Sequence, residues 1–150
     1  LEFRRVLFRS PAAIGAKLAK PDKPVVAFVG DGGFQMTNQE MGILEEYGID
    51  IKIVIVNNGT LGMVKQWQDK FFNKRFSHSV FNGQPDFIKL SEAYNVKAYL
   101  IDDPTHLEQK LDEAFQHDGP ALIDIRISPV EIVSPMVPSG KANHEMEGLL

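Results

Sequence analysis

An aspartate and an asparagine each follow an apolar stretch of this chain, and their side chains could together bind a metal ion. Asp31 stands in a Gly-Asp-Gly string after the apolar run at residues 25–29, and Asn58 follows the run at residues 51–56. A carboxylate and a carboxamide offer hard oxygen ligands, which suit Mg²⁺ or Ca²⁺ better than a thiophilic metal. Because Mg²⁺ usually completes its shell with phosphate oxygens and water, the pair predicts a site for a divalent cation that carries a diphosphate.

The glycines around Asp31 fit the same interpretation. Gly32 and Gly33 would let backbone N–H groups approach phosphate oxygens with no Cβ in the way. A helix that begins near Thr37 would add its positive end. Taken singly, Gly-Asp-Gly is more typical of a plain turn, and Asn-Asn of a plain strand exit. Their occurrence together, one crossover apart, favours a binding site.

Other phosphate-binding and metal-binding motifs are absent from the sequence. Gln35 stands where the dinucleotide fingerprint requires glycine, and there is no Gly-Lys-Ser/Thr string of a P-loop. Asp31 does not begin an EF-hand loop, since Gly33 and Gln35 occupy ligand positions. The four histidines lack the spacing of metal ligands.

Alternating strand-like and helix-like segments would position the two strings. Apolar runs predict strands over residues 25–29, 51–56, 97–101 and 121–127, the last of them toward an edge because its residues alternate. Helices are predicted over residues 11–20, 37–47, 63–72 and 104–116 and from residue 86, with Thr37 and Glu40 forming a capping box. This alternation predicts an α/β fold, a doubly wound parallel sheet in which ligands bind beyond the carboxyl ends of the strands.

Composition bounds the class of protein. Of 150 residues, 43% are hydrophobic and 24% charged, which is ordinary for a globular chain with one core. A formal net charge of −4 argues against nucleic acid as a partner, and no apolar run approaches membrane-spanning length. The absence of cysteine excludes disulfides and thiolate metal sites.

The first ten residues differ from the remainder. Residues 1–10 are basic and apolar in an otherwise acidic chain, and Glu2-Phe3 is what a common cloning-site hexamer encodes. We expect this segment to derive from a vector or adapter; a targeting signal would be longer. We expect an N-terminally truncated domain over residues 11–128 and a C-terminal arm without regular structure over residues 129–150.

Four stretches resemble a known family. The chain resembles the large catalytic subunit of biosynthetic acetolactate synthase, and the similarity extends over residues 11–150. It is most specific in the segments at residues 11–16, 33–36, 57–68 and 135–140. The strings at Asp31 and Asn58 match the thiamine-diphosphate motif of that family. The resemblance therefore implies the thiamine-diphosphate-binding fold, specifically the C-terminal domain of the enzyme.

The resemblance also implies roles for single residues. Asp31 and Asn58 would bind Mg²⁺ through their side chains, and Thr60 through its main-chain carbonyl. The other residues implied to contact the cofactor are Gly32, Gly33, Leu61, Gly62 and Met63. Val64 and Trp67 would face the substrate pocket, although without the resemblance the helical spacing of Trp67 from Val64 favours a core residue.

In function, the resemblance implies condensation of pyruvate with pyruvate or 2-ketobutyrate, with loss of CO₂, in the synthesis of isoleucine and valine. It implies FAD in the full-length enzyme, a homodimer or dimer of dimers, a small regulatory subunit, and a bacterial cytoplasm or a plastid. The activating glutamate of the family lies in a domain that this sequence lacks, so we expect the chain alone to be inactive. Two alternatives stay open: another thiamine-diphosphate 2-keto acid decarboxylase or carboligase, and a non-catalytic Mg²⁺-diphosphate binding module.

Overall fold

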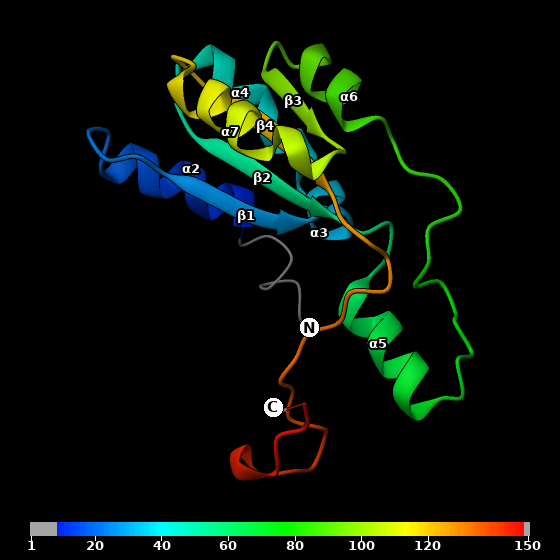
Figure 1. The fold of residues 1–150 in the computed structure, drawn as a ribbon. Coiled ribbons are helices and arrows are strands. Elements are labelled where there is room, and N and C mark those ends of the chain that lie inside the picture. Colours follow the sequence, from blue (N-terminus) through cyan, green and yellow to red (C-terminus); the bar gives the residue numbers. More distant parts are fainter. Residues whose placement is uncertain (1–8, 149–150) are drawn as a thin grey trace.

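A four-stranded parallel sheet with helices on both faces forms the body of the protein (Figure 1). This computed structural model describes residues 9–148, so most of the segment expected to be vector-derived lies outside the described residues. The strands are β1 (Val26–Gly30), β2 (Lys52–Asn57), β3 (Lys97–Ile101) and β4 (Ala121–Arg126). The helices are α2 (Arg9–Ala19), α3 (Asp31–Gln35), α4 (Gly42–Glu46), α5 (Gly62–Phe71), α6 (Phe87–Ala93) and α7 (Leu107–Gln116), with 3-10 turns η1 (Asn38–Met41), η2 (Pro104–His106) and η3 (Asn143–Glu145).

The order of the strands is β1-β2-β4-β3, which corrects one prediction. The strand near residue 121 was expected toward an edge, but β4 lies between β2 and β3. The alternation of residue types was misleading because Ala121 to Asp124 are all buried, and only Ile125 and Arg126 at the end of β4 reach solvent. A strand covered on both faces is a continuous buried run.

The helices cover the two faces of the sheet unequally. α2, α3, α4 and α6 pack on one face, where Ile14, Phe34 and Leu44 join the larger of two hydrophobic clusters. α7 covers the other face, over β3 and β4. Helices on both sides of a parallel sheet are the doubly wound arrangement that the sequence predicted.

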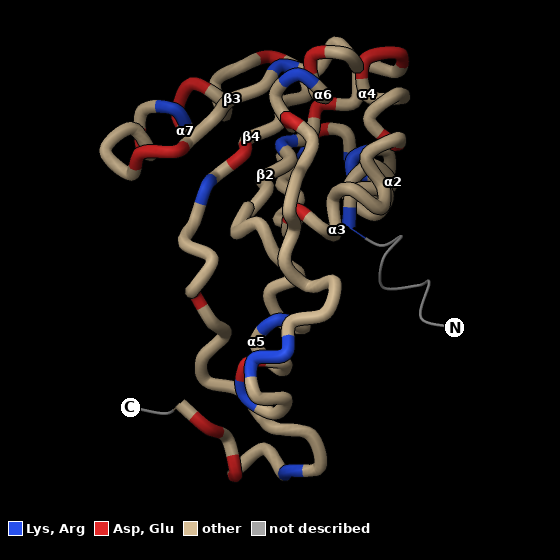
Figure 2. Tube along the Cα trace, turned by 90° about the vertical axis from the view of Figure 1, so that its right-hand side faces the viewer, with Lys and Arg blue, Asp and Glu red and all other residues tan. Residues whose placement is uncertain are grey.

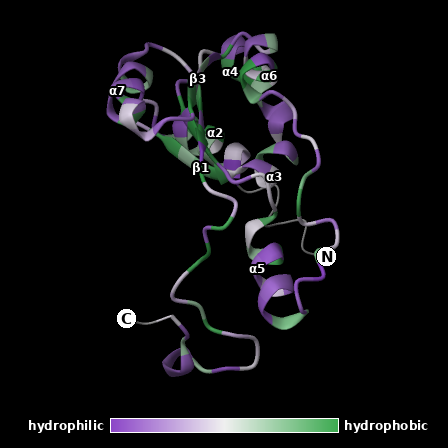
Figure 3. Ribbon diagram, turned by 45° about the vertical axis from the view of Figure 1, so that its right-hand side comes forward, coloured by the Kyte–Doolittle hydropathy of each residue, from purple (hydrophilic) through white to green (hydrophobic). Residues whose placement is uncertain are grey.

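α5 lies apart from this sheet body. We use the term α5 lobe for α5 together with residues 72–78 and the C-terminal arm of residues 129–148, which runs alongside α5 (Figure 1). Several lysine and arginine residues of the chain gather on α5 and just after it (Figure 2). Hydrophobic residues are concentrated instead in the strands of the sheet body (Figure 3). Apart from the short η3 turn and one antiparallel bridge between Met136 and Glu147, the described part of the arm has the irregular structure that the sequence predicted.

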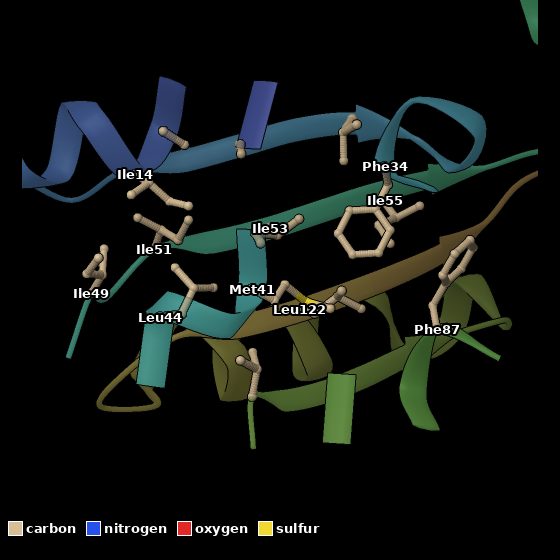
Figure 4. Packing of buried hydrophobic residues seen from close by; sticks show 14 residues of the cluster. Ile14, Phe34, Met41, Leu44, Ile49, Ile51, Ile53, Ile55, Phe87 and Leu122 are labelled. Atoms are coloured by element: carbon tan, nitrogen blue, oxygen red, sulfur yellow. The ribbon is translucent and has the colours of Figure 1, made fainter. Parts of the chain in front are cut away.

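Close packing of aromatic and branched side chains holds the sheet body together (Figure 4). The rings of Phe34 and Phe87 meet edge to face, with centroids 5.5 Å apart and planes at 82°. Both side chains are fully buried, as are Leu44, Ile53 and Leu122 of the same cluster. Burial of this kind stabilises a fold by about 1.5–3 kcal/mol for each large apolar side chain.

The segment after β1 differs from its prediction. The sequence predicts a turn at residues 30–33 and a helix capped by Thr37. Instead, α3 begins directly at Asp31, and the 3-10 turn η1 follows it before α4. The Thr37 hydroxyl is buried without a hydrogen-bond partner, so the predicted capping box with Glu40 is absent. Phe34 explains the difference, because its ring must reach the core within one turn of β1.

None of the helices within residues 9–148 is both long and apolar enough to cross a membrane.

Candidate metal and cofactor site

Asp31 lies at the carboxyl end of β1 with its side chain only 1% exposed. Its Oδ1 accepts a hydrogen bond from the N–H of Gly32 at 2.9 Å. Its Oδ2 accepts a hydrogen bond from the side-chain amide of Gln84, in the loop before α6. No lysine or arginine within residues 9–148 forms a salt bridge with Asp31. A buried carboxylate held only by neutral donors retains the capacity to bind a cation.

Asn58 is placed beside Asp31 by the neighbouring strand. Gly30 of β1 pairs with Val56 of β2, so the residues that follow the two strands leave the sheet at the same edge. The Asn58 Oδ1 accepts the N–H of Thr60 at 3.0 Å, which closes a turn around Gly59, whose φ is +69°. An amide oxygen has a second lone pair, so this bond leaves room for a metal ion.

One cavity of about 450 Å³ gathers the predicted residues. All the residues predicted to bind the metal or the cofactor line it, and Val64 does too. Trp67 is not among the lining residues; it is half-buried one turn further along α5, where its ring meets Phe71 at 5.7 Å. The structure thus brings all the predicted site residues into one cavity except Trp67.

The cavity also includes Arg9, at the start of α2. A Cβ placed on Gly33 would lie 3.1 Å from the Arg9 guanidinium, so this cation stands directly at the glycine turn. A guanidinium in this position is suited to an anionic group in the cavity. The sequence did not predict Arg9, because it belongs to the segment expected to be vector-derived.

The glycines show how closely the backbone approaches the site. A Cβ on Gly32 would lie 2.6 Å from Leu61 Cδ2, and one on Gly62 would lie 2.9 Å from Asn58 Nδ2. A side chain at either position would force the Leu61 or the Asn58 side chain to move. The prediction that the Gly32 N–H approaches a phosphate oxygen is modified, since this N–H donates to the Asp31 carboxylate in this structure.

The donor set fits a hard divalent cation. Asp31, Asn58 and Thr60 all line the cavity, and the predicted ligand atoms are two side-chain oxygens and one main-chain carbonyl. Three protein ligands would leave the other octahedral positions of Mg²⁺ to phosphate oxygens and water. Within residues 9–148 no cluster of three His, Asp or Glu side chains offers an alternative metal site.

A larger cavity, of about 740 Å³, lies at the opposite edge of the sheet among Asp50, Lys97 and Asp118. Nearby, the Lys52 ammonium is bound by Asp50 Oδ1 at 2.7 Å and by the His117 carbonyl at 2.8 Å. That edge holds the amino ends of the strands, where parallel sheets do not bind ligands as a rule. We therefore assign the smaller cavity as the site.

Two residues near the site were missed from the sequence. Gln84 lies in a polar loop that carries no recognisable pattern. The sequence did contain a sign that Asp124 is unusual, because it is the single acidic residue within the apolar run of β4. Its carboxylate is fully buried, and this burial raises its pKa, although a hydrogen bond from Asn57 and the charge of Arg126 oppose the shift. The charge of Asp31 raises the pKa of Asp124 further.

Fold and site together are those expected of a domain for a diphosphate cofactor at the carboxyl ends of a parallel sheet. The family model described as "Thiamine pyrophosphate enzyme, C-terminal TPP binding domain" matches residues 8–125. The chain therefore belongs to the thiamine pyrophosphate enzymes, as the C-terminal cofactor-binding domain.

Sequence relatives narrow the likeness to one kind of enzyme. The chain is 53% identical over 142 residues to the acetolactate synthase large subunit of Lactococcus lactis, a match that covers 95% of this chain and 24% of that protein. A probable acetolactate synthase large subunit from Methanococcus aeolicus is 45% identical over 142 residues, with the same two coverages. The chain thus spans about a quarter of the length of these curated relatives.

A solved structure confirms the fold. The thiamine diphosphate-dependent 4-hydroxybenzoylformate decarboxylase of Rhodococcus jostii RHA1 matches with a TM-score of 0.74 and 30% identity, over 81% of this chain and 23% of that one. The predicted α/β class and the predicted family are both confirmed.

Proposed function

We propose that this chain is the cofactor-anchoring part of an acetolactate synthase catalytic subunit and that it holds Mg²⁺ and thiamine diphosphate. The observation that carries the proposal is the shared cavity of Asp31 and Asn58, in a chain 53% identical to an acetolactate synthase large subunit. Asp31, Asn58 and the Thr60 carbonyl bind the metal. Gly32 and Gly33 allow the diphosphate to approach the backbone.

The cofactor, when bound, supplies the electron sink for decarboxylation and carbon–carbon bond formation. The protein supplies position and a dry pocket. Met63 and Val64 line the cavity with side chains about half exposed, so they form an apolar wall on the α5 side of the site. We assign Val64, with Trp67 further along the helix, to the side of the site that receives the 2-keto acids.

Among the described residues that line the cavity, no carboxylate is left free for proton transfer once the metal is bound. Of the described residues that line the cavity, Asp31 and Arg9 are the ionisable ones, and the first is committed to the metal. We therefore infer that the purified chain binds the cofactor but does not catalyse. Catalysis then depends on the remainder of the subunit, with FAD, a homodimeric core and a small regulatory subunit, in a bacterial cytoplasm or a plastid. The products would be 2-acetolactate and 2-aceto-2-hydroxybutyrate, for branched-chain amino acids.

Calorimetry tests the binding half of the proposal. Thiamine diphosphate titrated into the chain with Mg²⁺ should bind in a metal-dependent manner, and Asp31→Asn should weaken binding about 100-fold, since it removes the one anionic ligand, a loss of about 2.7 kcal/mol. Binding that does not depend on Mg²⁺, or on Asp31, would contradict the assignment. Acetolactate formed by the purified chain would contradict the inference that it is inactive.

The reaction is tested by a chimera. Residues 11–148 replace the matching region of the Lactococcus lactis large subunit, and the products from pyruvate are analysed. We expect acetolactate. The second candidate function is a 2-keto acid decarboxylase, which the similarity to a decarboxylase structure suggests. Acetaldehyde as the main product would support this decarboxylase function and contradict the proposed one.

A further inference from the structure

Asp124 is a buried acid with no contact to the cavity. Its side chain is fully buried in β4, and it is not among the residues that line the site. Its Oδ1 accepts a hydrogen bond from Asn57 Nδ2 at 2.9 Å, and its Oδ2 lies 3.0 Å from an Arg126 guanidinium nitrogen. An acid in a strand interior is rarely the most stable choice, because an apolar residue of similar size often stabilises the fold as well or better. A positional role would account for the acid at this position.

Asn57 connects that acid to the metal-binding turn. While its Nδ2 donates to Asp124, its Oδ1 accepts the N–H of Gly59 at 3.2 Å. Its main-chain carbonyl accepts the N–H of Ile127 at 2.9 Å, so the residue is fixed to the strand at its backbone as well. The side-chain amide is thereby held at both ends, and its orientation is set by Asp124.

Gly59 is the residue on which the turn depends. It lies between the two predicted metal ligands Asn58 and Thr60, and its φ of +69° is the left-handed conformation that reverses the chain there. The turn also closes on itself through the Thr60 N–H and the Asn58 Oδ1. The bond from Asn57 to the Gly59 N–H ties this local turn to the interior of the sheet.

We propose that Asp124 and Asn57 form a buried relay that orders the turn at Gly59 and so presents Asn58 and the Thr60 carbonyl to the metal. The inference rests on the proposed function of that turn as a metal site. Both are positioning residues, because Asp124 acts on the ligands through Asn57 and neither lines the cavity. Partners of this kind, one shell outside the ligands, typically change metal affinity by about 10- to 100-fold.

Two measurements on the full chain test the relay. Mn²⁺ binding in the presence of thiamine diphosphate is followed by electron paramagnetic resonance, and amide exchange at Gly59 is followed by NMR. Asn57→Ala removes both side-chain bonds. We expect Mn²⁺ affinity to fall about tenfold and exchange at Gly59 to accelerate.

A double substitution provides the rescue. In Asn57→Asp with Asp124→Asn, the amide introduced at position 124 can donate to the carboxylate introduced at position 57, and the second oxygen of that carboxylate can accept the Gly59 N–H. We expect both measurements to return to within about threefold of the wild-type values. Because this pair keeps the volume and the net charge of the relay, it stays informative if Asn57→Ala folds poorly.

Ser91→Ala is the matched control. Ser91 is fully buried and its hydroxyl donates to the Val96 carbonyl at 3.0 Å, near the amino end of β3 and away from the site. It should lower thermal stability without changing Mn²⁺ affinity. The relay is overturned if Asn57→Ala binds Mn²⁺ as the wild type does, if Ser91→Ala weakens binding equally, or if the double substitution fails to recover. If the wild-type chain itself binds no Mn²⁺, the proposed function fails, and exchange at Gly59 still decides whether the relay orders the turn.

Discussion

The sheet body and the α5 lobe are held by different kinds of contact. In the sheet body, Phe34, Phe87 and other large apolar residues are fully buried in two hydrophobic clusters, one on each face of the sheet. In the α5 lobe the large apolar residues Met63, Val64 and Phe72 are about half exposed, and polar bonds connect helix to arm. The proposed metal end of the site thus lies on the densely packed region, and the proposed substrate end lies on the more exposed one.

The difference in packing between the two regions suits two separate functions, binding of the metal and diphosphate and contact with the substrate. Binding a metal with a diphosphate requires oxygen ligands fixed within narrow limits, which rigid strand ends provide. Contact with a substrate benefits from a segment that can adjust, and segments of low local stability have few buried apolar contacts. The boundary runs through the turn at Gly59, between Asn58 on the body side and Met63 on the lobe side.

The largest expected effect is on global stability. Phe87→Ala should lower the free energy of unfolding by about 3–5 kcal/mol, because it opens a cavity in the closed core of the sheet body. The matched change in the α5 lobe, Phe72→Ala, removes a side chain that is 51% exposed and should cost about 0.5 kcal/mol. Urea unfolding measures both. Equal losses would show that the two regions form one core.

The next effect is local to the arm. Gln66 is buried in α5, and its side chain donates to the Val133 carbonyl at 2.9 Å and accepts the Val133 N–H at 2.8 Å. Gln66→Ala should release the arm, with faster amide exchange at Val133, since two hydrogen bonds contribute about 1–3 kcal/mol. The free energy of global unfolding should change little.

Gln68→Ala is the matched control for the arm. Gln68 lies on the same helix but bonds to Ser77 and Ser79, so its loss should accelerate exchange at residues 77–79 and leave Val133 unchanged. Faster exchange at Val133 in both variants would mean that α5 and the arm loosen together.

A smaller effect concerns the loop that returns from the α5 lobe to the sheet body. Gln84 in this loop donates to Asp31, so Gln84→Ala should weaken Mn²⁺ binding about tenfold, or ~1.4 kcal/mol, by freeing that carboxylate to rotate. Asn82→Ala, an exposed position in the same loop, should have no effect. Unchanged Mn²⁺ affinity in Gln84→Ala would place the metal end of the site wholly within the sheet body.

The smallest effect is on the pH dependence of stability. Burial raises the pKa of Asp124 above its ordinary value of 3.8, so the folded state binds this proton more tightly than the unfolded state. Stability from this group is therefore present at low pH and is lost as pH rises from about 3.8 through the raised pKa. Asp124→Asn should not show this loss.

The measurement compares urea unfolding of the two proteins over a pH series. Asp86 and Asp103 have a lowered pKa because hydrogen bonds from Lys89 and Thr105 respectively favour their charged forms, and they act in the opposite direction. Both are present in wild type and variant, so their contribution cancels in the difference. A difference that stays constant across the series would contradict the raised pKa of Asp124.

Much of the sheet body was predictable because its signals are local. Apolar runs located all four strands within a residue or two, and Asp31 and Asn58 stand at their ends in the sequence itself. The helix after β1 was misplaced because Phe34, rather than the capping potential of Thr37, decides where the chain turns. The central place of β4 was missed because a mixture of buried acid and apolar residues resembles alternation.

The sequence by itself determined which residues are capable of the proposed chemistry: the two side chains predicted to supply oxygen ligands, the glycines beside them and the strands that carry them. Only the tertiary structure decided which distant residues support those ligands. Gln84 reaches Asp31 across 53 residues of sequence, and Asp124 reaches Asn57 across 67. Such pairs depend on strand order and loop path, which follow from the packing of the whole core, whereas strand-forming runs follow from short-range pattern alone.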